Sequence, residues 1–478
     1  MTWPWGQDVP NGDYALGFRC VHDGNSETFA APQHWRRSLG RVTSMNDRPK
    51  TGVWSRSRSV LAMAAGVAKH ELGHRVRSTL ASVEKIDASE IRTRIEQAKV
   101  MAESLGRLKG AFMKAGQLLS IDASDMLPPE AQEVMAKLQG AAEPVDFAVI
   151  RGVIEEELGD RLARIEELDP VPAASASIGQ VHRGKVDGVS VAIKVQYPGI
   201  AASIDSDMAI LEKVVGTFSG MARRHIDLSP TFEELRTLLH LEADYVRERS
   251  YLDRFRALSA ADPRFFVPRS FAELSTERVL TMEWAAGESL QGWIKSQPSA
   301  ERRTTFGSTV LDLYCLEFFV WGVVQTDPNF GNFLVRSDDT IVLLDFGASV
   351  EYDDAFRVQY TNLLRVVGRG DTKEIVAATI SFGLIDDRES DESKQLFVDL
   401  LVNSVEPFSP TKQPFVFRDE EYATRTRDAG QRFVRSLRYS PPPRQILFLH
   451  RKLGGIFQLL KRLDVSLDLR PYWEKMIA

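Results

Sequence analysis

The sequence predicts an α+β fold in which a strand-rich half is followed by a mostly helical half. The residues before Lys185 and after Gly188 favour two antiparallel strands, and residues 276–284 favour another. Helical patterns dominate the chain after Asp353. With 478 residues, 43% of them apolar and 26% charged, the chain is long enough for two or three globular domains.

The composition argues against several classes of protein. The net charge is -6, so no overall positive field favours nucleic-acid binding. Two cysteines, Cys20 and Cys315, are too few for a disulfide framework, and we expect free thiols in a reducing compartment. The sequence shows no apolar run of about 18 residues that would predict a spanning helix, and no secretory signal pattern at its start.

The first part of the chain carries little that predicts chemistry. Residues 1–50 lack a hydrophobic period, which predicts a poorly ordered tail. Basic residues dominate from 36 to 85, as in a solvated helix or a helix that contacts anionic lipid. His70, Glu71 and His74 form an H-E-x-x-H sequence, which on a helix could bind Zn²⁺ as in a metallopeptidase. A third histidine does not follow, so this is the weakest functional hypothesis.

Residues 51–140 are predicted to form a helical extension. An apolar stripe of helical period spans residues 91–119 and contains Lys114 and Gln117. A lysine near a helix end is favoured by the helix dipole, and Gly116 can cap that end. From the residues alone the pair therefore has either a structural or a functional explanation.

A loop of small residues precedes the first strand pair and is the predicted nucleotide loop. In protein kinases a glycine-rich turn covers the phosphates, whereas here Ala and Ser replace most glycines and restrict positive φ. The second strand carries V-A-I-K, whose Lys194 would reach the α and β phosphates unless it is simply an exposed strand lysine. The loop comprises Ala173, Ala174, Ser175, Ala176, Ser177, Ile178, Gly179 and Gln180.

Three carboxylates are candidates to pair with Lys194. Glu242, Asp244 and Glu248 lie on one helix predicted over residues 230–258. On a helical period Asp244 and Glu248 share a face, whereas Glu242 and Glu248 cannot. Each could instead pair with a neighbouring arginine of the same helix. The strand at 276–284 then leads into a hinge, where Glu283 is a predicted nucleotide-binding residue.

Asp327, Asn332 and Asp345 are brought together by a hairpin predicted over 333–335 and 340–344. Their oxygens suit Mg²⁺, which commonly shares its ligands with phosphates. The order D-x-x-x-x-N then D-F-G matches protein kinases, where the first Asp orients the attacking hydroxyl and the other two residues hold Mg²⁺. A surface Asp-Asn turn is the alternative. The pattern predicts a bilobal protein-kinase-like fold that binds ATP or ADP with Mg²⁺, with lobes at 141–286 and 287–478.

Six motifs together resemble the UbiB/ADCK (AarF-like) family of atypical kinases, in its ubiquinone-biosynthesis branch. The resemblance extends over roughly residues 90–465. The motifs are KAGQ at 114–117, AASASIGQVH at 173–182, VAIK at 191–194, E-A-D at 242–244, QTDPNFGN at 325–332 and LLDFGAS at 343–349.

This resemblance implies roles for particular residues. Lys114 and Gln117 would belong to a helical extension that folds over the active site and blocks protein substrates. Lys194 would pair with Glu248, while Glu242 and Asp244 would lie near the phosphates. Two departures from ordinary protein kinases, the lack of A-P-E after Asp345 and of His-Arg before Asp327, also disfavour a peptide substrate.

The resemblance also implies a function. It favours a Mg²⁺-dependent ATPase or small-molecule kinase that supports ubiquinone biosynthesis or related lipid metabolism. The alternative is a nucleotide-gated lipid-binding scaffold without phosphoryl transfer. Expected partners are an isoprenoid lipid or quinone intermediate, quinone-biosynthesis proteins, a membrane surface and a second copy of the chain. The expected location is cytoplasmic and peripheral at the inner membrane, or mitochondrial in a eukaryote.

Overall fold

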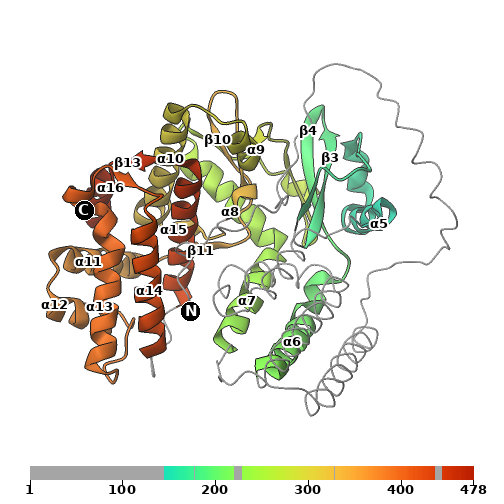
Figure 1. The fold of residues 1–478 in the computed structure, drawn as a ribbon. Coiled ribbons are helices and arrows are strands. Elements are labelled where there is room, and N and C mark those ends of the chain that lie inside the picture. Colours follow the sequence, from blue (N-terminus) through green and yellow to red (C-terminus); the bar gives the residue numbers. More distant parts are fainter. Residues whose placement is uncertain (1–144, 177, 220–228, 328, 437–443) are drawn as a thin grey trace, which may run out of the picture.

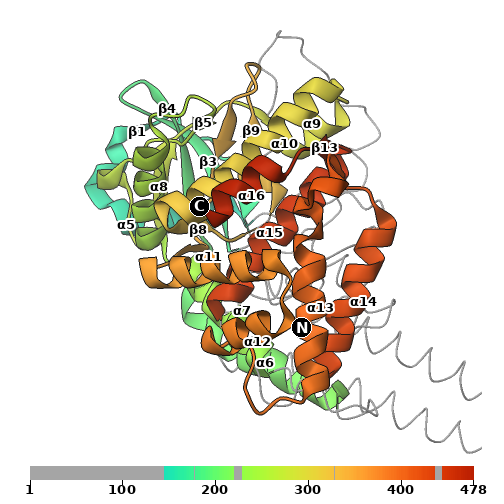
Figure 2. The ribbon, with the colours of Figure 1, turned by 90° about the vertical axis from the view of Figure 1, so that its left-hand side faces the viewer.

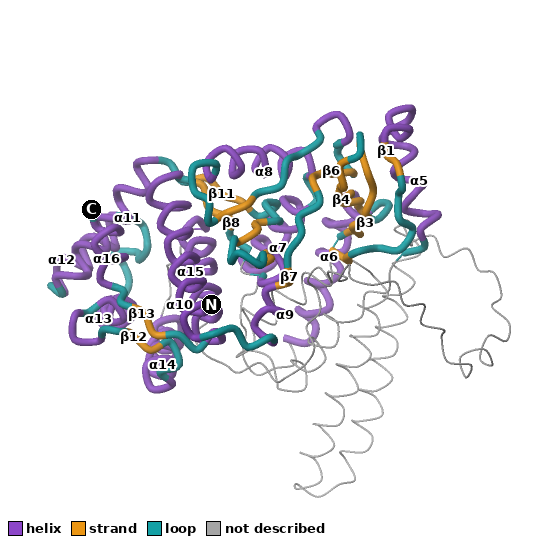
Figure 3. Tube along the Cα trace, turned by 90° about the horizontal axis from the view of Figure 1, so that it is seen from above, coloured by secondary structure: helices purple, strands orange, loops and turns teal. Residues whose placement is uncertain are grey.

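The computed structural model describes residues 145–176, 178–219, 229–327, 329–436 and 444–478. A β-sheet lies at one end of the molecule and a group of helices at the other, with α8 (Tyr245–Ser259) between them (Figures 1 and 3). This is the two-part α+β arrangement that the sequence predicts. The tail, the helical extension with Lys114 and Gln117, and the His70–His74 motif lie outside the described residues, and so do the boundaries at residues 50 and 140.

The first sheet has five strands. β3 pairs with β1, β2 and β4, and β4 pairs with β6, all antiparallel. The β3–β4 hairpin turns through Asp187 and Gly188, both at positive φ, as the sequence predicts. The strands are β1 (Ile165–Glu166), β2 (Ala174–Ala176), β3 (Gly179–Val186), β4 (Val189–Gln196) and β6 (Val279–Glu283).

Helix α5 (Phe147–Leu158) covers this sheet. Asp146 caps its first turn by accepting a hydrogen bond from the Ala148 N–H at 2.7 Å. Ile150 and Ile154 lie one turn apart on the buried face of the helix and join the core with Ile193 of β4.

The prediction of one helix over residues 230–258 is wrong, because two helices occupy this stretch. They are α7 (Ser229–Glu242) and α8, which follow α6 (Ile200–Ser219). Asp244 is the N-cap of α8 and accepts a hydrogen bond from the Arg247 N–H at 2.9 Å. An aspartate that caps a new helix competes with continuation of the preceding one, which explains the break.

A second sheet and a two-stranded ribbon lie beyond the hinge. The predicted hairpin is present as β9 and β10, with Ile341 opposite Val335. β10 also pairs in parallel with β5, and β9 pairs with β7. β8 and β11 form the ribbon. The strands are β5 (Phe265–Phe266), β7 (Glu288–Ser289), β8 (Val323–Gln325), β9 (Phe333–Val335), β10 (Ile341–Leu343) and β11 (Ser349–Glu351).

The remainder of the chain is helical, as predicted, and α13 and α14 lie side by side (Figures 1 and 2). Phe397 and Phe433 stack between them with ring centroids 4.4 Å apart. The elements are α9 (Leu290–Lys295), α10 (Ala300–Cys315), a π-helical segment η4 (Leu316–Trp321), α11 (Asp354–Arg369), α12 (Thr372–Ser381), α13 (Asp391–Val405), β12 (Phe415–Val416), α14 (Glu420–Ser436), α15 (Arg444–Leu463), β13 (Ser466–Leu467) and α16 (Arg470–Ile477).

Two expectations from the composition, free thiols and the lack of a spanning helix, can be compared with the described residues. Cys315 is a free, buried thiol, while Cys20 lies outside the described part of the chain. Among the helices that the structure describes, none combines the length and the apolar character needed to span a bilayer.

Candidate functional site

A buried ion pair joins the first sheet to α8. The Lys194 Nζ of β4 donates to both carboxylate oxygens of Glu248, at 2.7 and 2.9 Å. Glu248 is 1% exposed and Lys194 is 8% exposed. Of the three carboxylates left open by the sequence, Glu248 is therefore the partner of Lys194, as the family resemblance implies.

Asp345, which follows β10, extends this pair. Its Oδ2 lies 3.4 Å from Lys194 Nζ, and its Oδ1 accepts the Gly347 N–H at 3.0 Å. The Asp345 side chain is about one-third exposed. Lys194 thus contacts one buried carboxylate and one that solvent or a ligand can reach.

Charges in this cluster shift one another's proton affinity. Burial disfavours the charged form of Lys194, but Asp345 and Glu248 outweigh that effect and raise the pKa of Lys194 well above its usual value. Burial raises the pKa of Glu248 to about 7, and the opposite charge of Lys194 limits this rise. Lys194 therefore carries its positive charge at neutral pH.

The break between α7 and α8 brings Glu242 to the same place. A Cβ placed on Gly347 would lie 3.4 Å from Asp345 Oδ1, 3.6 Å from the Glu242 Cα and 3.7 Å from Glu248 Oε2. The argument that Glu242 and Glu248 cannot share a face assumed one continuous helix, and that assumption is wrong because α7 ends at Glu242 and α8 begins at Tyr245. Asp244 is instead exposed and caps α8.

Helix α8 also contacts the segment that follows Asp345, through hydrogen bonds and a packed aromatic ring. Arg247 donates to the carbonyl oxygen of Gly347 at 2.7 Å and to that of Ser349. The buried Phe346 ring packs against Phe255 of α8 with centroids 4.7 Å apart. Backbone geometry around Asp345 is thus fixed from one helix.

Asp327 and Asn332 lie together in the loop after β8. Asn332 donates from Nδ2 to Asp327 Oδ2 at 3.1 Å, so its amide oxygen points away from that bond. Within the described residues no three His, Cys, Asp or Glu side chains form a metal cluster. A Mg²⁺ ion at Asp345 could take its other oxygen ligands from the Asn332 amide, bound phosphates and water, which suits its preferences.

The predicted nucleotide loop, residues 173–180, consists of the β2–β3 turn together with the strand residues that flank it. Ser175 pairs with Gln180 across the two strands. Gly179 has no room for a side chain, because a Cβ there would collide with the Val195 carbonyl and lie 3.0 Å from the Tyr245 hydroxyl. Ala173, Ala174 and Ala176 line the same turn and are half-buried, Ile178 is buried, and Ser177 lies outside the described residues.

Two predicted nucleotide-binding side chains point to the protein instead. Gln180 is completely buried, and its Oε1 accepts the Val145 N–H while its amide lies 3.4 Å from His182 Nε2. Glu283 accepts the Arg269 N–H at 3.4 Å. A nucleotide would therefore meet the backbone of Gln180 rather than its side chain.

Sequence reasoning missed Arg247 and Tyr245. The Lys194 Nζ lies 5.0 Å from the centroid of the buried Tyr245 ring. Both residues adjoin the E-A-D motif, and Arg247 appeared only as an intrahelical partner for a carboxylate. Their position in the sequence between Asp244 and Glu248 was the available signal. A helical period, however, does not predict that Arg247 reaches Gly347.

The segment after Asp345 is short. Three residues separate Asp345 from β11, and Tyr352 and Asp353 alone separate β11 from α11. A protein kinase orders a longer activation loop there, which phosphorylation controls. The described chain leaves no room for such a loop at this position.

Comparisons with known proteins agree with this geometry. A family model for the ABC1 atypical kinase-like domain matches residues 137–379. The chain is 32% identical over 382 residues to "Atypical kinase COQ8, mitochondrial" of Saccharomyces cerevisiae, covering 79% of this chain and 75% of that protein. It is 33% identical over 387 residues to "Atypical kinase COQ8B, mitochondrial" of Rattus norvegicus, covering 79% and 71%. "Probable serine/threonine-protein kinase abkA" of Dictyostelium discoideum is 30% identical over 459 residues, covering 90% and 80%.

A solved structure shares the fold. It is an Rv3197–erythromycin complex from Mycobacterium tuberculosis, with a TM-score of 0.54, 24% identity, and coverage of 83% of this chain and 98% of that chain. The predicted bilobal kinase-like fold is confirmed by this match and by the family model.

Proposed function

This chain belongs to the ABC1 atypical kinase-like family, and on that premise we propose that it is a Mg²⁺-dependent ATPase or small-molecule kinase that supports isoprenoid-quinone biosynthesis. The observation that carries the proposal is the Lys194–Glu248–Asp345 cluster beside Asp327 and Asn332. The comparisons lend no support to a zinc metallopeptidase.

Each residue of the site would have a separate role in phosphoryl transfer. Lys194, held by Glu248, would bind the α and β phosphates, and the turn between β2 and β3 would cover them with backbone N–H groups. Asp345 and Asn332 would hold Mg²⁺, which neutralises charge on the phosphates when bound. Asp327 would orient the attacking oxygen of water or an acceptor and accept its proton. Positioning and electrostatics, rather than covalent catalysis, would supply the rate.

A small acceptor fits the site better than a peptide. The chain passes from Asp345 to α11 without the loop that holds peptide substrates in protein kinases. We propose water or a small isoprenoid-lipid or quinone intermediate as the acceptor. A predicted covering helix with Lys114 and Gln117 would restrict access further.

We propose peripheral binding at the inner membrane, in a mitochondrion if the source is eukaryotic, with quinone-biosynthesis proteins and a second copy as candidate partners. Two relatives carry "mitochondrial" in their names. We also propose a division of the chain into a tail at 1–50, an extension at 51–140, and lobes at 141–286 and 287–478.

The experiment is quinone profiling of cells that lack their own family member and express this chain. Wild type should restore quinone, whereas Asp345→Asn should not, because its metal-binding carboxylate is gone. The control is Asp387→Asn, a change in an exposed carboxylate that pairs with Lys394. Restoration by Asp345→Asn would favour the lipid-binding scaffold.

A further inference from the structure

A second buried lysine–glutamate pair lies beneath the β8–β11 ribbon. Lys452 Nζ of α15 lies 3.1 Å from Glu317 Oε2 of the π-helical segment η4. Their side chains are only 4% and 1% exposed. Moving two charges out of water costs several kcal/mol per ion, so a buried pair is weak grounds for stability by itself. π-Helical turns are also frequent at functional sites.

The pair is linked to the strand that leads into the site. Lys452 Nζ lies 3.4 Å from Gln325 Oε1, and Gln325 is the last residue of β8. Asp327 follows two residues later. Gln325 Nε2 is buried without a hydrogen-bond partner, so the contact with Lys452 is what orients this amide.

The opposite strand leads to the other acid. Ser349, the first residue of β11, is the register partner of Gln325 and is fully buried. It comes directly after the segment that begins with Asp345. The loops with Asp327 and Asp345 therefore leave the same end of one ribbon, above the Lys452–Glu317 pair.

Two cations of helix α15 also lie over rings on either side of Asn332, those of Phe330 and Phe333. The Lys452 Nζ lies 6.0 Å from the centroid of the Phe333 ring, and the Arg462 guanidinium lies 5.7 Å from that of Phe330. One helix thus meets the loop before and after Asn332 and the strand before Asp327.

We propose that Lys452 and Glu317 are positioning residues, which orient Gln325 and through the β8–β11 ribbon set the separation of Asp327 and Asp345. The inference rests on the proposed function of those two acids. Burial raises the pKa of Glu317 to about 7, while Lys452 and the Gln325 backbone oppose that rise. The ionised form of Glu317 is therefore stabilised both by Lys452 and by the last residue of β8. A purely structural pair would only join α15 to η4.

Three variants separate positioning from stability. Lys452→Met should lower kcat for ATP hydrolysis about 10- to 100-fold, because a displacement near 1 Å can cost about 10²-fold. KM for ATP should change less than about threefold, since Lys194 still binds the phosphates. The double variant Glu317→Gln/Lys452→Met leaves no unpaired buried charge, so its unfolding midpoint should return toward wild type while kcat stays low. Gln325→Met keeps both charges and should show the same kcat loss.

Lys461→Met is the matched control, because Lys461 lies on the same helix but pairs with the exposed Glu420 at 2.9 Å. Its kcat should stay within about twofold of wild type. Recovery of kcat in the folded double variant, or a wild-type kcat in Gln325→Met, would overturn the proposal.

A binding readout keeps the two proposals distinguishable. If wild type neither hydrolyses ATP nor transfers phosphate to an isoprenoid-lipid acceptor, the proposed function fails, but the gain in ADP affinity on adding Mg²⁺ still reports the placement of Asp345. By calorimetry, Gln325→Met should lose most of that gain and Lys461→Met should keep it. An unchanged gain in Gln325→Met overturns the positioning role.

Discussion

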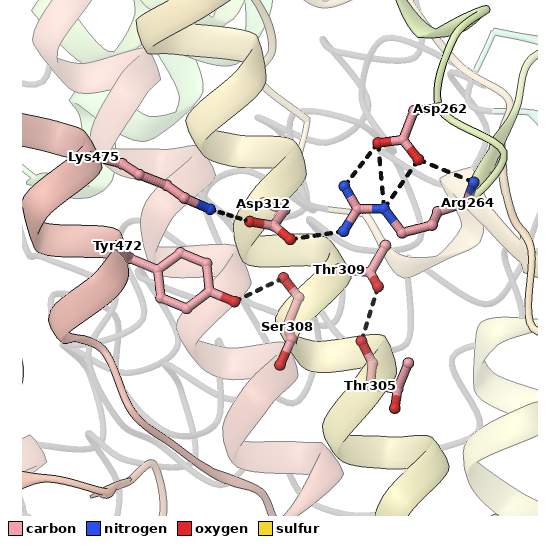
Figure 4. A network of polar contacts seen from close by, with 8 residues as sticks. All are labelled: Asp262, Arg264, Thr305, Ser308, Thr309, Asp312, Tyr472 and Lys475. Atoms are coloured by element: carbon pink, nitrogen blue, oxygen red, sulfur yellow. Dashed lines mark hydrogen bonds and ion pairs between the residues drawn. The ribbon is translucent and has the colours of Figure 1, made fainter.

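Two charged networks of this chain use the same chemistry in different surroundings. One is the Lys194–Glu248–Asp345 cluster, in which Glu248 is 1% exposed. The other centres on Asp312 of α10, which accepts from Lys475 of α16 at 2.8 Å and from Arg264 at 2.7 Å (Figure 4). There the side chains of Lys475 and Arg264 are 56% and 44% exposed. Both networks tie together segments distant in sequence.

The difference lies in what solvent does to each network. Burial alone would raise the pKa of Asp312, but hydrogen bonds from Lys475 and Arg264 outweigh it and hold the pKa below its usual value. Water and salt share in stabilising those charges, so each exposed pair contributes little. Lys194 and Glu248 are instead shielded from water, so their charges must satisfy one another. We infer that the first network is retained for chemistry and the second for packing of α16 on α10.

Lys194→Met should give the largest effect. Without its cation the site loses the donor for the phosphates, and ATP hydrolysis should fall about 10²-fold or more. Lys185→Met is the control, because Lys185 lies on the neighbouring strand and pairs with Glu167 at the surface, at 2.7 Å. Steady-state kinetics of ATP hydrolysis should be measured for both variants. Equal losses of rate would show that Lys194 contributes no more to hydrolysis than the surface lysine does.

The second-largest expected effect is on the pH dependence of the free energy of unfolding, and it comes from the buried Lys194–Glu248 pair. Between the unfolded pKa of Glu248, near 4.5, and its folded value of about 7, the folded state binds more protons, so this group lowers stability as pH rises. Removing Lys194 removes the attraction that limits this rise. Lys194→Met should therefore lose more stability at pH 8 than at pH 5, by up to about 1.4 kcal/mol, because one pH unit separates the folded pKa of about 7 from pH 8.

Urea unfolding at the two pH values measures this loss. The double variant Lys194→Met/Glu248→Gln should show no such extra slope, because the titrating carboxyl is gone. A slope that persists in the double variant would assign the effect to another group.

Arg247→Met should have an intermediate effect. It removes a charged donor from the carbonyls of Gly347 and Ser349, which should lower the free energy of unfolding by about 2 to 3 kcal/mol. Arg254→Met is its control, because Arg254 lies on the same helix and pairs with Glu351 at 2.8 Å in an exposed position. A loss there should be under about 1 kcal/mol. Similar losses in both variants would contradict the special role of Arg247.

Lys475→Met should have the smallest effect. Its exposed bond to Asp312 should contribute under about 1 kcal/mol, less at high salt, and ATP hydrolysis should not change. Unfolding in low and high salt tests this. A loss above about 2 kcal/mol would show that exposure does not separate the two networks.

The sequence predicted much of this site because its signals are local. The V-A-I-K strand and the hairpin between Asn332 and Asp345 follow from patterns within a few residues. The partner of Lys194 was not settled by such patterns, since three carboxylates had equal claims. Only the family resemblance favoured Glu248, which the structure places 2.7 Å away.

Long-range contacts account for what the sequence did not predict. The helical period continues across residues 243–244, so the break between α7 and α8 was missed, although Asp244 is a strong capping residue. Contacts from Arg247 to Gly347 and from Lys452 to Gln325 join residues 100 and 127 positions apart. No periodic pattern encodes such pairings. They depend on how the helices pack around the ribbon.

Nucleotide titration of purified wild type and Asp345→Asn, with and without Mg²⁺, tests the central claim most directly. If the cluster of Lys194, Glu248 and Asp345 is a nucleotide and metal site, wild type should bind ATP more tightly when Mg²⁺ is added. Asp345→Asn should keep its Mg²⁺-free affinity, which depends on Lys194, and should lose the gain from Mg²⁺. Equal gains in the two proteins would contradict the account.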